Sequence, residues 1–183
     1  MAENSVRDAT WHDALLDKFE VQITAVVSAR LQGEPEAVGD LVQKTFDTAW
    51  AKRYKVPDDP LPWLYKTAKY HLNNYYRWSC RRRPELSGHE VLEAAIMRHL
   101  SNSGSVEHGI DLRRALAKLT PAQCELLMMA YVDELSRAQI AEILGISSAA
   151  GRQRLQNVRL KIRQILGNDY LKQDHGDERE RGR

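Results

Sequence analysis

Cysteine is scarce in this sequence, and long apolar runs are absent from it. The two cysteines among its 183 residues, Cys80 and Cys124, lie far apart and form no CxxC pair. This usage fits a reduced compartment and two unpaired thiols. No apolar run approaches the ~18 residues of a membrane span, and the first residues lack the basic and apolar blocks of a secretory signal. We therefore expect a cytoplasmic protein without membrane insertion of its own.

Acidic residues are missing from one stretch of the chain. Residues 60–84 contain no Asp or Glu, and residues 61–83 hold six Lys and Arg together with six of the chain's 13 aromatic residues. Cations neutralise phosphates and flat rings stack on unpaired bases, so this mixture indicates nucleic-acid binding. The alternative is a surface helix whose aromatics lie partly in the core. A second basic island at residues 134–166 suggests two separate contacts with a polyanion, although the net charge is only +2.

The sequence also lacks a recognisable set of catalytic residues. Its six histidines are scattered, and no nucleophile or metal-binding cluster is visible beside them. We expect neither an enzyme nor a cofactor or metal site.

Apolar spacing predicts helices throughout the first part of the chain. Residues 11–32 and 36–54 carry apolar side chains at intervals of three and four. Prolines between residues 56 and 62 end the second helix, and a third is expected at 62–80. The second helix has a polar face of Asp40, Gln43, Lys44 and Asp47, which periodicity alone would assign to solvent.

The second part of the chain predicts another helical unit after a linker. Residues 85–109 are rich in Gly and Ser, although 91–100 could form a helix. Capping boxes start helices after Thr120 and Ser136, and Gly145 turns the chain into a basic helix at 148–166. Two helices joined by such a turn predict a helix-turn-helix, with an ordinary helical hairpin as the alternative. The final residues, 168–183, lack periodic apolar positions and are expected to be a disordered tail.

These motifs resemble the extracytoplasmic-function (group IV) branch of the sigma-70 transcription initiation factors. The sequence DLVQKTFDTAW is similar to the family's polymerase-binding helix, and PWLYKTAKYHLNNYYRWSCRRRP to its promoter-melting segment. The sequence from LTPAQCELL to QNVRLKIR is similar to its −35-reading domain. The resemblance implies an all-α fold of two small helical domains: 10–84 binds polymerase and the −10 element, 85–109 is a flexible linker, and 110–167 reads the −35 element.

The resemblance also implies roles for individual residues. Contact with the clamp of the polymerase largest subunit falls to Asp40, Gln43, Lys44 and Asp47. Contact with the melted −10 strand and its phosphates falls to Trp63, Lys66, Tyr70, Asn73, Asn74, Arg77, Arg81, Arg82 and Arg83. Contact with the −35 duplex falls to Ser148, Arg152, Gln153, Arg154, Gln156, Asn157 and Arg159. The implied partners are core RNA polymerase, through its clamp and flap, promoter DNA and an anti-sigma factor.

Four positions depart from the family's usual pattern. Lys44 replaces a Glu, Tyr70 an Asn, and Asn157 a frequent Arg, while Gly151 lies in an unusual start of the recognition helix. These departures leave a second hypothesis open, in which the chain is a stand-alone helix-turn-helix regulator that does not engage polymerase.

Overall fold

The computed structural model describes residues 7–31, 34–79, 88–102 and 109–166, and the described part is helical without strands. This confirms the predicted all-α fold. The elements are α1 (Ala9–Arg30), α2 (Pro35–Ala51), a short 3-10 turn (Arg53–Lys55), α3 (Leu61–Ser79), α4 (Gly88–Asn102), α5 (Gly109–Ala117), α6 (Pro121–Leu127), a π-helical turn (Met128–Val132), α7 (Arg137–Leu144) and α8 (Ser148–Leu166). Arg81, Arg82, Arg83 and the expected tail lie outside the described residues. No described helix combines the length and apolarity that crossing a bilayer requires.

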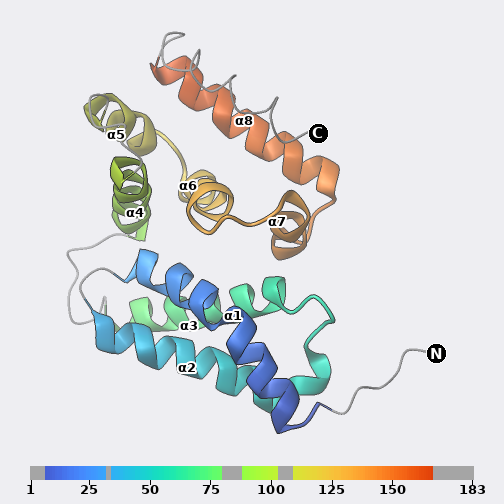
Figure 1. Cartoon of the computed structure of the whole chain (residues 1–183). Helices are drawn as coiled ribbons and strands as arrows, with labels where there is room; N and C mark the ends of the chain where they lie inside the picture. The colour runs from blue at the N-terminus through green and yellow to red at the C-terminus, as the bar shows by residue number, and fades with distance from the viewer. Residues whose placement is uncertain (1–6, 32–33, 80–87, 103–108, 167–183) are drawn as a thin grey trace.

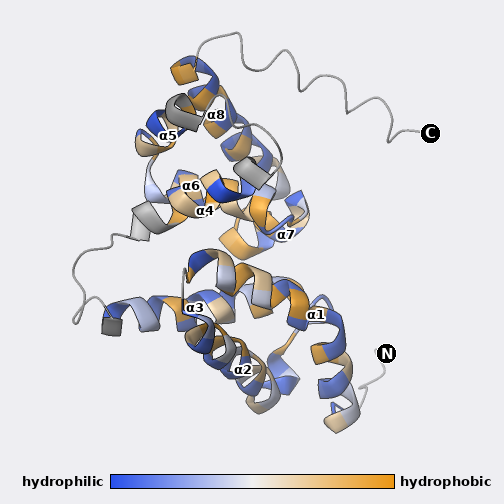
Figure 2. Ribbon diagram, turned by 60° about the vertical axis from the view of Figure 1, so that its left-hand side comes forward, coloured by the Kyte–Doolittle hydropathy of each residue, from blue (hydrophilic) through white to orange (hydrophobic). Residues whose placement is uncertain are grey.

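Helices α1, α2 and α3 pack around one apolar core (Figure 1). Ile23 of α1, Phe46 of α2 and Leu64 of α3 are among its fully buried side chains. Asp8 caps α1 by accepting a hydrogen bond from the Trp11 amide at 3.1 Å, and Pro35 opens α2, where a missing N–H is harmless. In Figure 2 each of these helices carries both hydrophobic and hydrophilic residues, as amphipathic helices around a shared core do.

Helices α4 to α8 form the second group. Both predicted capping boxes are present: the Thr120 hydroxyl accepts from the Gln123 amide, and the Ser136 hydroxyl accepts from the Gln139 amide. Helix α4 lies inside the expected linker and is longer than the 91–100 helix considered from the sequence. It packs against α5, α6 and the π-helical turn, with Ala95 and Ile96 buried. This part of residues 85–109 therefore contributes to the core of the second group.

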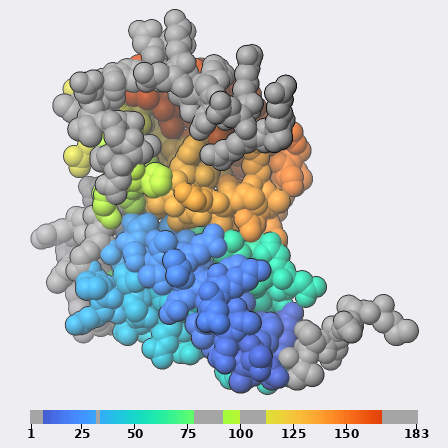
Figure 3. Space-filling view, viewed as in Figure 1, coloured from blue at the N-terminus to red at the C-terminus, as the bar shows by residue number. Residues whose placement is uncertain are grey.

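The two groups pack directly against each other (Figure 3). Lying across this interface is a buried polar cluster, which comprises Arg30 of α1, Tyr65 of α3, Glu125 of α6 and Asp133, the residue after the π-helical turn. Arg30 is 4% exposed and donates to both Asp133 carboxylate oxygens at 3.0 and 2.8 Å. It also donates to Glu125 at 3.2 Å and to the Tyr65 hydroxyl at 2.7 Å.

Burial and charge act in opposite directions on this cluster. Burial disfavours the Arg30 cation, but the hydrogen bond to the Tyr65 hydroxyl oxygen and the negative charges of Glu125 and Asp133 outweigh it, and the pKa of Arg30 is raised. Burial also raises the pKa of Tyr65 well above its ordinary value, so the phenol keeps its proton. The Tyr65 hydroxyl oxygen lies 2.8 Å from a Glu125 carboxylate oxygen and 3.0 Å from an Asp133 carboxylate oxygen, so it can donate its proton to either one. The cluster thus satisfies a buried cation with two carboxylates and one phenol.

The backbone around Asp133 departs from regular geometry. The π-helical turn ends with the Asp133 amide donating to the Met128 carbonyl at 2.8 Å, and Glu134 has a φ of +52°, in the left-handed region. A non-glycine residue in that region is strained, and such strain persists where surrounding contacts fix it. The Arg30–Asp133 contact is one such constraint on the turn.

Candidate nucleic-acid and polymerase interfaces

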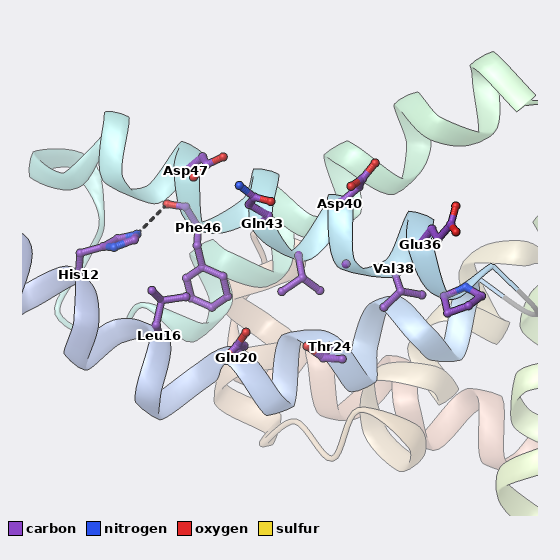
Figure 4. Close-up of a pocket in the computed structure, with 13 residues that line it drawn as sticks. His12, Leu16, Glu20, Thr24, Glu36, Val38, Asp40, Gln43, Phe46 and Asp47 are labelled. Atoms are coloured by element: carbon purple, nitrogen blue, oxygen red, sulfur yellow. Dashed lines mark hydrogen bonds between the residues drawn. The ribbon is translucent and has the colours of Figure 1, made fainter.

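A groove of about 650 Å³ runs between α1 and α2. Its rim includes Asp40, Gln43 and Asp47, which form one row along α2 above a floor that contains Leu16 and Phe46 (Figure 4). Glu20 and Glu36 add two further carboxylates, and the described lining contains no Lys or Arg. Carboxylates around an apolar floor suit a partner segment that presents cations around apolar side chains. Three of the four residues predicted to bind polymerase therefore share one acidic groove.

Lys44, the fourth, does not line the acidic groove. It is exposed and lines a second groove of about 760 Å³ between the end of α2 and the start of α3. The lining of this groove is Lys44, Asp47, Thr48, Ala51, Lys52, Lys55, Trp63, Lys66, Thr67, Tyr70 and His71. Four of these residues are lysines and one is acidic. The groove is therefore electropositive and bordered by two aromatic rings.

His71 lines this second groove beside two of its lysines. Its pKa is lowered, first by partial burial and then by the neighbouring Lys44 and Lys52 cations. The Thr48 hydroxyl lies 3.0 Å from the His71 Nε2 atom and donates to the Lys44 carbonyl at 2.7 Å. A neutral His71 leaves the lysines as the groove's positive charges.

The outward face of α3 continues from this groove. Lys66, Tyr70, Asn73 and Arg77 are exposed, whereas Trp63 and Asn74 are half-buried. Tyr70 is 62% exposed, so its ring is open to a stacking partner. Tyr65, which counted among the aromatics of the basic stretch, is instead fully buried in the interface cluster. The stretch therefore divides its aromatics between a free surface and the core.

Helices α7 and α8 meet in a helix-turn-helix arrangement. Gly145 adopts a φ of +64°, which glycine tolerates without a steric penalty, and the Ser147 hydroxyl accepts from the Ala150 amide to cap α8. All seven residues predicted to contact the −35 duplex are exposed: Ser148, Arg152, Gln153, Arg154, Gln156, Asn157 and Arg159.

These seven residues are not equivalent on α8. At 3.6 residues per turn they occupy more than half of the helix circumference, which is wider than the side that can face one groove. Gln153 donates to Asn157 at 2.9 Å, so these two side chains form one unit on the outer side. The Arg159 guanidinium instead lies 5.4 Å from the centre of the Tyr131 ring. The Gln153–Asn157 pair is therefore turned to solvent, whereas Arg159 lies against Tyr131.

Gly151 marks the close approach of α8 to α7. A methyl group at this position would lie 3.4 Å from the Ala141 Cβ atom, an ordinary van der Waals distance. The space therefore admits alanine but little more.

The residues that sequence reasoning missed are those of the interface cluster. Arg30 and Asp133 are distant in sequence, and neither belongs to a motif that predicts their pairing. One weak sequence signal indicated that Arg30 is buried. It lies at the end of an apolar-patterned helix, on the stripe that includes Val26 and Val27.

Comparisons with known proteins show which proteins this chain is similar to. Residues 110–162 match the family model described as sigma-70, region 4. Over 152 residues the chain is 28% identical to the probable RNA polymerase sigma factor RfaY of Xanthomonas campestris pv. campestris. That match covers 79% of this chain but only 37% of RfaY, so the chain spans much less than the full length of its relative.

Two solved structures are also similar to this chain. CnrH, solved in complex with the cytosolic domain of CnrY, has a TM-score of 0.54 at 22% identity, covering 88% of this chain and 91% of CnrH. RpoE of Bartonella quintana, solved with the anti-sigma factor NepR, has a TM-score of 0.49 at 16% identity, covering 86% and 99%. CnrH supports the fold, while the sequence matches carry the likeness to sigma factors. Residues 110–162 thus match sigma-70 region 4, and the chain as a whole is similar to an RNA polymerase sigma factor.

Proposed function

We propose that this chain is an alternative sigma factor that binds core RNA polymerase and directs initiation at particular promoters. The observation that carries the proposal is the acid-free, exposed face of α3 in a chain whose residues 110–162 match sigma-70 region 4. The two features offer one site for an open strand and one for duplex DNA. A sigma factor uses both in one promoter, whereas a stand-alone regulator needs only the duplex site.

The two DNA sites act in sequence. The outer side of α8 docks in the major groove of the −35 duplex and positions the DNA. The face of α3 then holds bases that leave the stack near −10. Unpairing a base costs a few kcal/mol, and stacking on an aromatic ring returns about 1–3 kcal/mol. Capture by Tyr70 and Trp63 can therefore bias strand opening without a chemical reaction.

Core polymerase is proposed to occupy the acidic groove between α1 and α2. Asp40, Gln43 and Asp47 form a row that can pair with cations of the polymerase clamp. The second group of helices is proposed to contact the flap. CnrH was solved with a protein partner, and we propose that an anti-sigma factor binds this chain.

Lys44 is proposed to contact the promoter strand. It lines the lysine-rich groove with Lys52 and Lys66, and it is not among the residues lining the acidic groove. A cation at this position would add one phosphate contact beside the stacking rings. If Lys44 contacts DNA, a Lys at a position where the family usually has a Glu does not oppose polymerase binding.

Reconstitution with core polymerase tests the proposed function. Polymerase that carries this chain should start transcription at a restricted set of sites, and sequencing of the transcripts should reveal two shared elements upstream. Asp40→Ala combined with Gln43→Ala should abolish co-purification with polymerase. Failure of the wild-type chain to bind polymerase, with duplex binding intact, would favour the stand-alone regulator.

The role of Lys44 has its own test. For a single-stranded −10 oligonucleotide, the slope of the logarithm of the binding constant against the logarithm of the salt concentration should become shallower by about 0.7 in Lys44→Ala. This is the value for one phosphate contact. Polymerase affinity should stay unchanged. Lys18→Ala, which removes an exposed cation from α1, is the matched control and should alter neither quantity. Loss of polymerase affinity with an unchanged salt slope would show that Lys44 contacts polymerase and not the promoter strand.

A further inference from the structure

The exposed side chains of α8 form three rows along the helix. Successive residues are about 100° apart around its axis, because an α-helix has 3.6 residues per turn. The core side carries the buried residues Gly151, Leu155 and Val158. The opposite side, called here the outward row, carries only uncharged residues: Gln153, Gln156, Asn157, Leu160 and Gln164. The flanks carry exposed arginines: Arg152, Arg159 and Arg163 on one flank and Arg154 on the other.

This arrangement matches the two kinds of surface in a major groove. A recognition helix in the groove has base edges in front of it and a phosphate backbone on either side. Arginines on the flanks suit the phosphates, whose contacts fix position and carry no sequence information. The Arg159 guanidinium lies 5.4 Å from the centre of the Tyr131 ring, so it is held on its flank and away from the outward row. Base readout therefore falls to the outward row.

Within the outward row, Asn157 holds the Gln153 amide in one orientation. The Gln153 Nε2 atom donates to the Asn157 Oδ1 atom at 2.9 Å. This bond uses one of the two Nε2 hydrogens, so the second hydrogen and the Gln153 Oε1 atom can serve another partner. If the amide turned over, its oxygen would face the Asn157 oxygen and the bond would be lost. Gln153 therefore presents one donor and one acceptor in a fixed order.

A donor beside an acceptor is the pattern that adenine requires. In the major groove adenine offers the N7 acceptor and the N6 amino donor, which one amide can contact together. Guanine offers two acceptors, so the Gln153 Oε1 atom would lie against the guanine O6 atom. Cytosine offers only a donor, and thymine an acceptor with a methyl group. An unrestrained glutamine could rotate its amide to suit guanine, but one bound to Asn157 loses a hydrogen bond by doing so.

We propose that Gln153, oriented by Asn157, selects an A·T base pair in the duplex element that α8 reads. Asn157 is a positioning residue, because it acts through Gln153. The Arg that is frequent in the family at this position has donors only, so it could not accept from Gln153. The inference rests on the proposed docking of α8 in duplex DNA, which an alternative sigma factor and a stand-alone regulator share.

Selection from a pool of duplexes with a randomised central segment tests the assignment. The full chain, alone and bound to core polymerase, retains duplexes whose sequences give the base preference at each position. The wild type should prefer A·T over G·C at one position by about 5- to 150-fold, the discrimination of one bidentate contact. Gln153→Ala should lose this preference and keep those at other positions. Gln164→Ala, which removes another exposed amide from the outward row, is the matched control and should keep all of them.

Two variants of Asn157 test the positioning role. Asn157→Ala should weaken the A·T preference at the same position, because Gln153 can then rotate its amide and donate to guanine. Asn157→Asp keeps an oxygen that accepts from Gln153, so it should retain the preference while its negative charge lowers the affinity for all duplexes alike. A merely structural role of Asn157 would change affinity without changing base preference. Helical circular dichroism of each variant checks that α8 is intact.

Two outcomes overturn the inference. Selective binding in which Gln153→Ala keeps the A·T preference would show that another residue reads this base pair. A wild-type preference in Asn157→Ala would show that Asn157 does not orient Gln153. Failure of the proposed function is a distinct result: a chain that binds no polymerase but selects A·T through Gln153 contradicts the sigma-factor proposal and supports this inference. Absence of selective duplex binding in every form, with or without polymerase, would overturn both.

Discussion

Replacing Tyr65 by phenylalanine is the most selective perturbation of the interface cluster. The change removes one hydroxyl and leaves the buried ring in place. That hydroxyl accepts from Arg30 at 2.7 Å and can donate its single proton to Glu125 at 2.8 Å or Asp133 at 3.0 Å. The substitution therefore removes one accepted and one donated hydrogen bond, both to charged partners.

The magnitude follows from these two bonds. A hydrogen bond to a charged group contributes about 1.5–3 kcal/mol, but Arg30 keeps its two bonds to Asp133, and Glu125 keeps Lys69. We therefore expect the arrangement in which the two groups of helices pack together to lose about 2–3 kcal/mol of stability relative to one in which they separate, a roughly 30- to 150-fold change in the ratio of the two.

The assay is a urea titration of the full chain carrying a donor and an acceptor dye at Asp17 of α1 and Gln164 of α8, both exposed positions, with energy transfer between the dyes as the readout. The midpoint at which energy transfer is lost should fall in Tyr65→Phe, while the midpoint for loss of helical circular dichroism should change less. Tyr70→Phe, which removes an exposed hydroxyl from the same helix, should leave the transfer midpoint unchanged. A destabilisation below about 0.5 kcal/mol would mean that water replaces the hydroxyl readily, and would refute the reasoning from a dry, fully paired cluster.

Three further predictions concern pH and the glycines of the helix-turn-helix. Burial alone would raise the pKa of the Glu125 carboxyl, but Arg30 and Lys69 outweigh it and the pKa is lowered. Glu125 therefore stabilises the packing of the two groups of helices above pH 4.5, the ordinary pKa of a glutamate, and this stabilisation is lost as the pH falls through the lowered pKa of Glu125. Energy transfer between the two dyes, measured against pH, should reveal the loss. Gly151→Ala should stabilise α8 by up to about 1 kcal/mol in thermal unfolding, because the added methyl group fits and alanine favours the helix, and destabilisation would show that the α7–α8 contact is tighter than 3.4 Å. Gly145→Ala should destabilise by about 1 kcal/mol at its left-handed φ of +64°, and an unchanged melting temperature would contradict a required left-handed turn.

Local sequence signals predicted individual helices well. Both capping boxes, at Thr120 and Ser136, require only a hydroxyl and a glutamine three residues apart, so the sequence contains all of their information. The prolines after Val56 likewise separated α2 from α3. The π-helical turn at Met128–Val132 carried no such signal, because the contacts that accompany it come from other parts of the chain.

Only part of the candidate site could be predicted from the sequence. Periodicity placed Asp40, Gln43 and Lys44 on one polar face of α2, yet that face borders two grooves of different charge. Which groove a residue lines depends on where α1 and α3 pack. The helical period of α2 alone could not separate Lys44 from Asp40 and Gln43.

The sequence alone determined that this protein is helical, that one stretch of it lacks acidic residues, and that a helix-turn-helix follows. Those properties depend on residues near one another in the chain. Only the tertiary structure decided that Tyr65 is buried while Tyr70 is exposed, and that Arg30 pairs with Glu125 and Asp133 across the interface. A buried charge is tolerated only beside partners that balance it, and the packing of distant helices decides which residues those partners are.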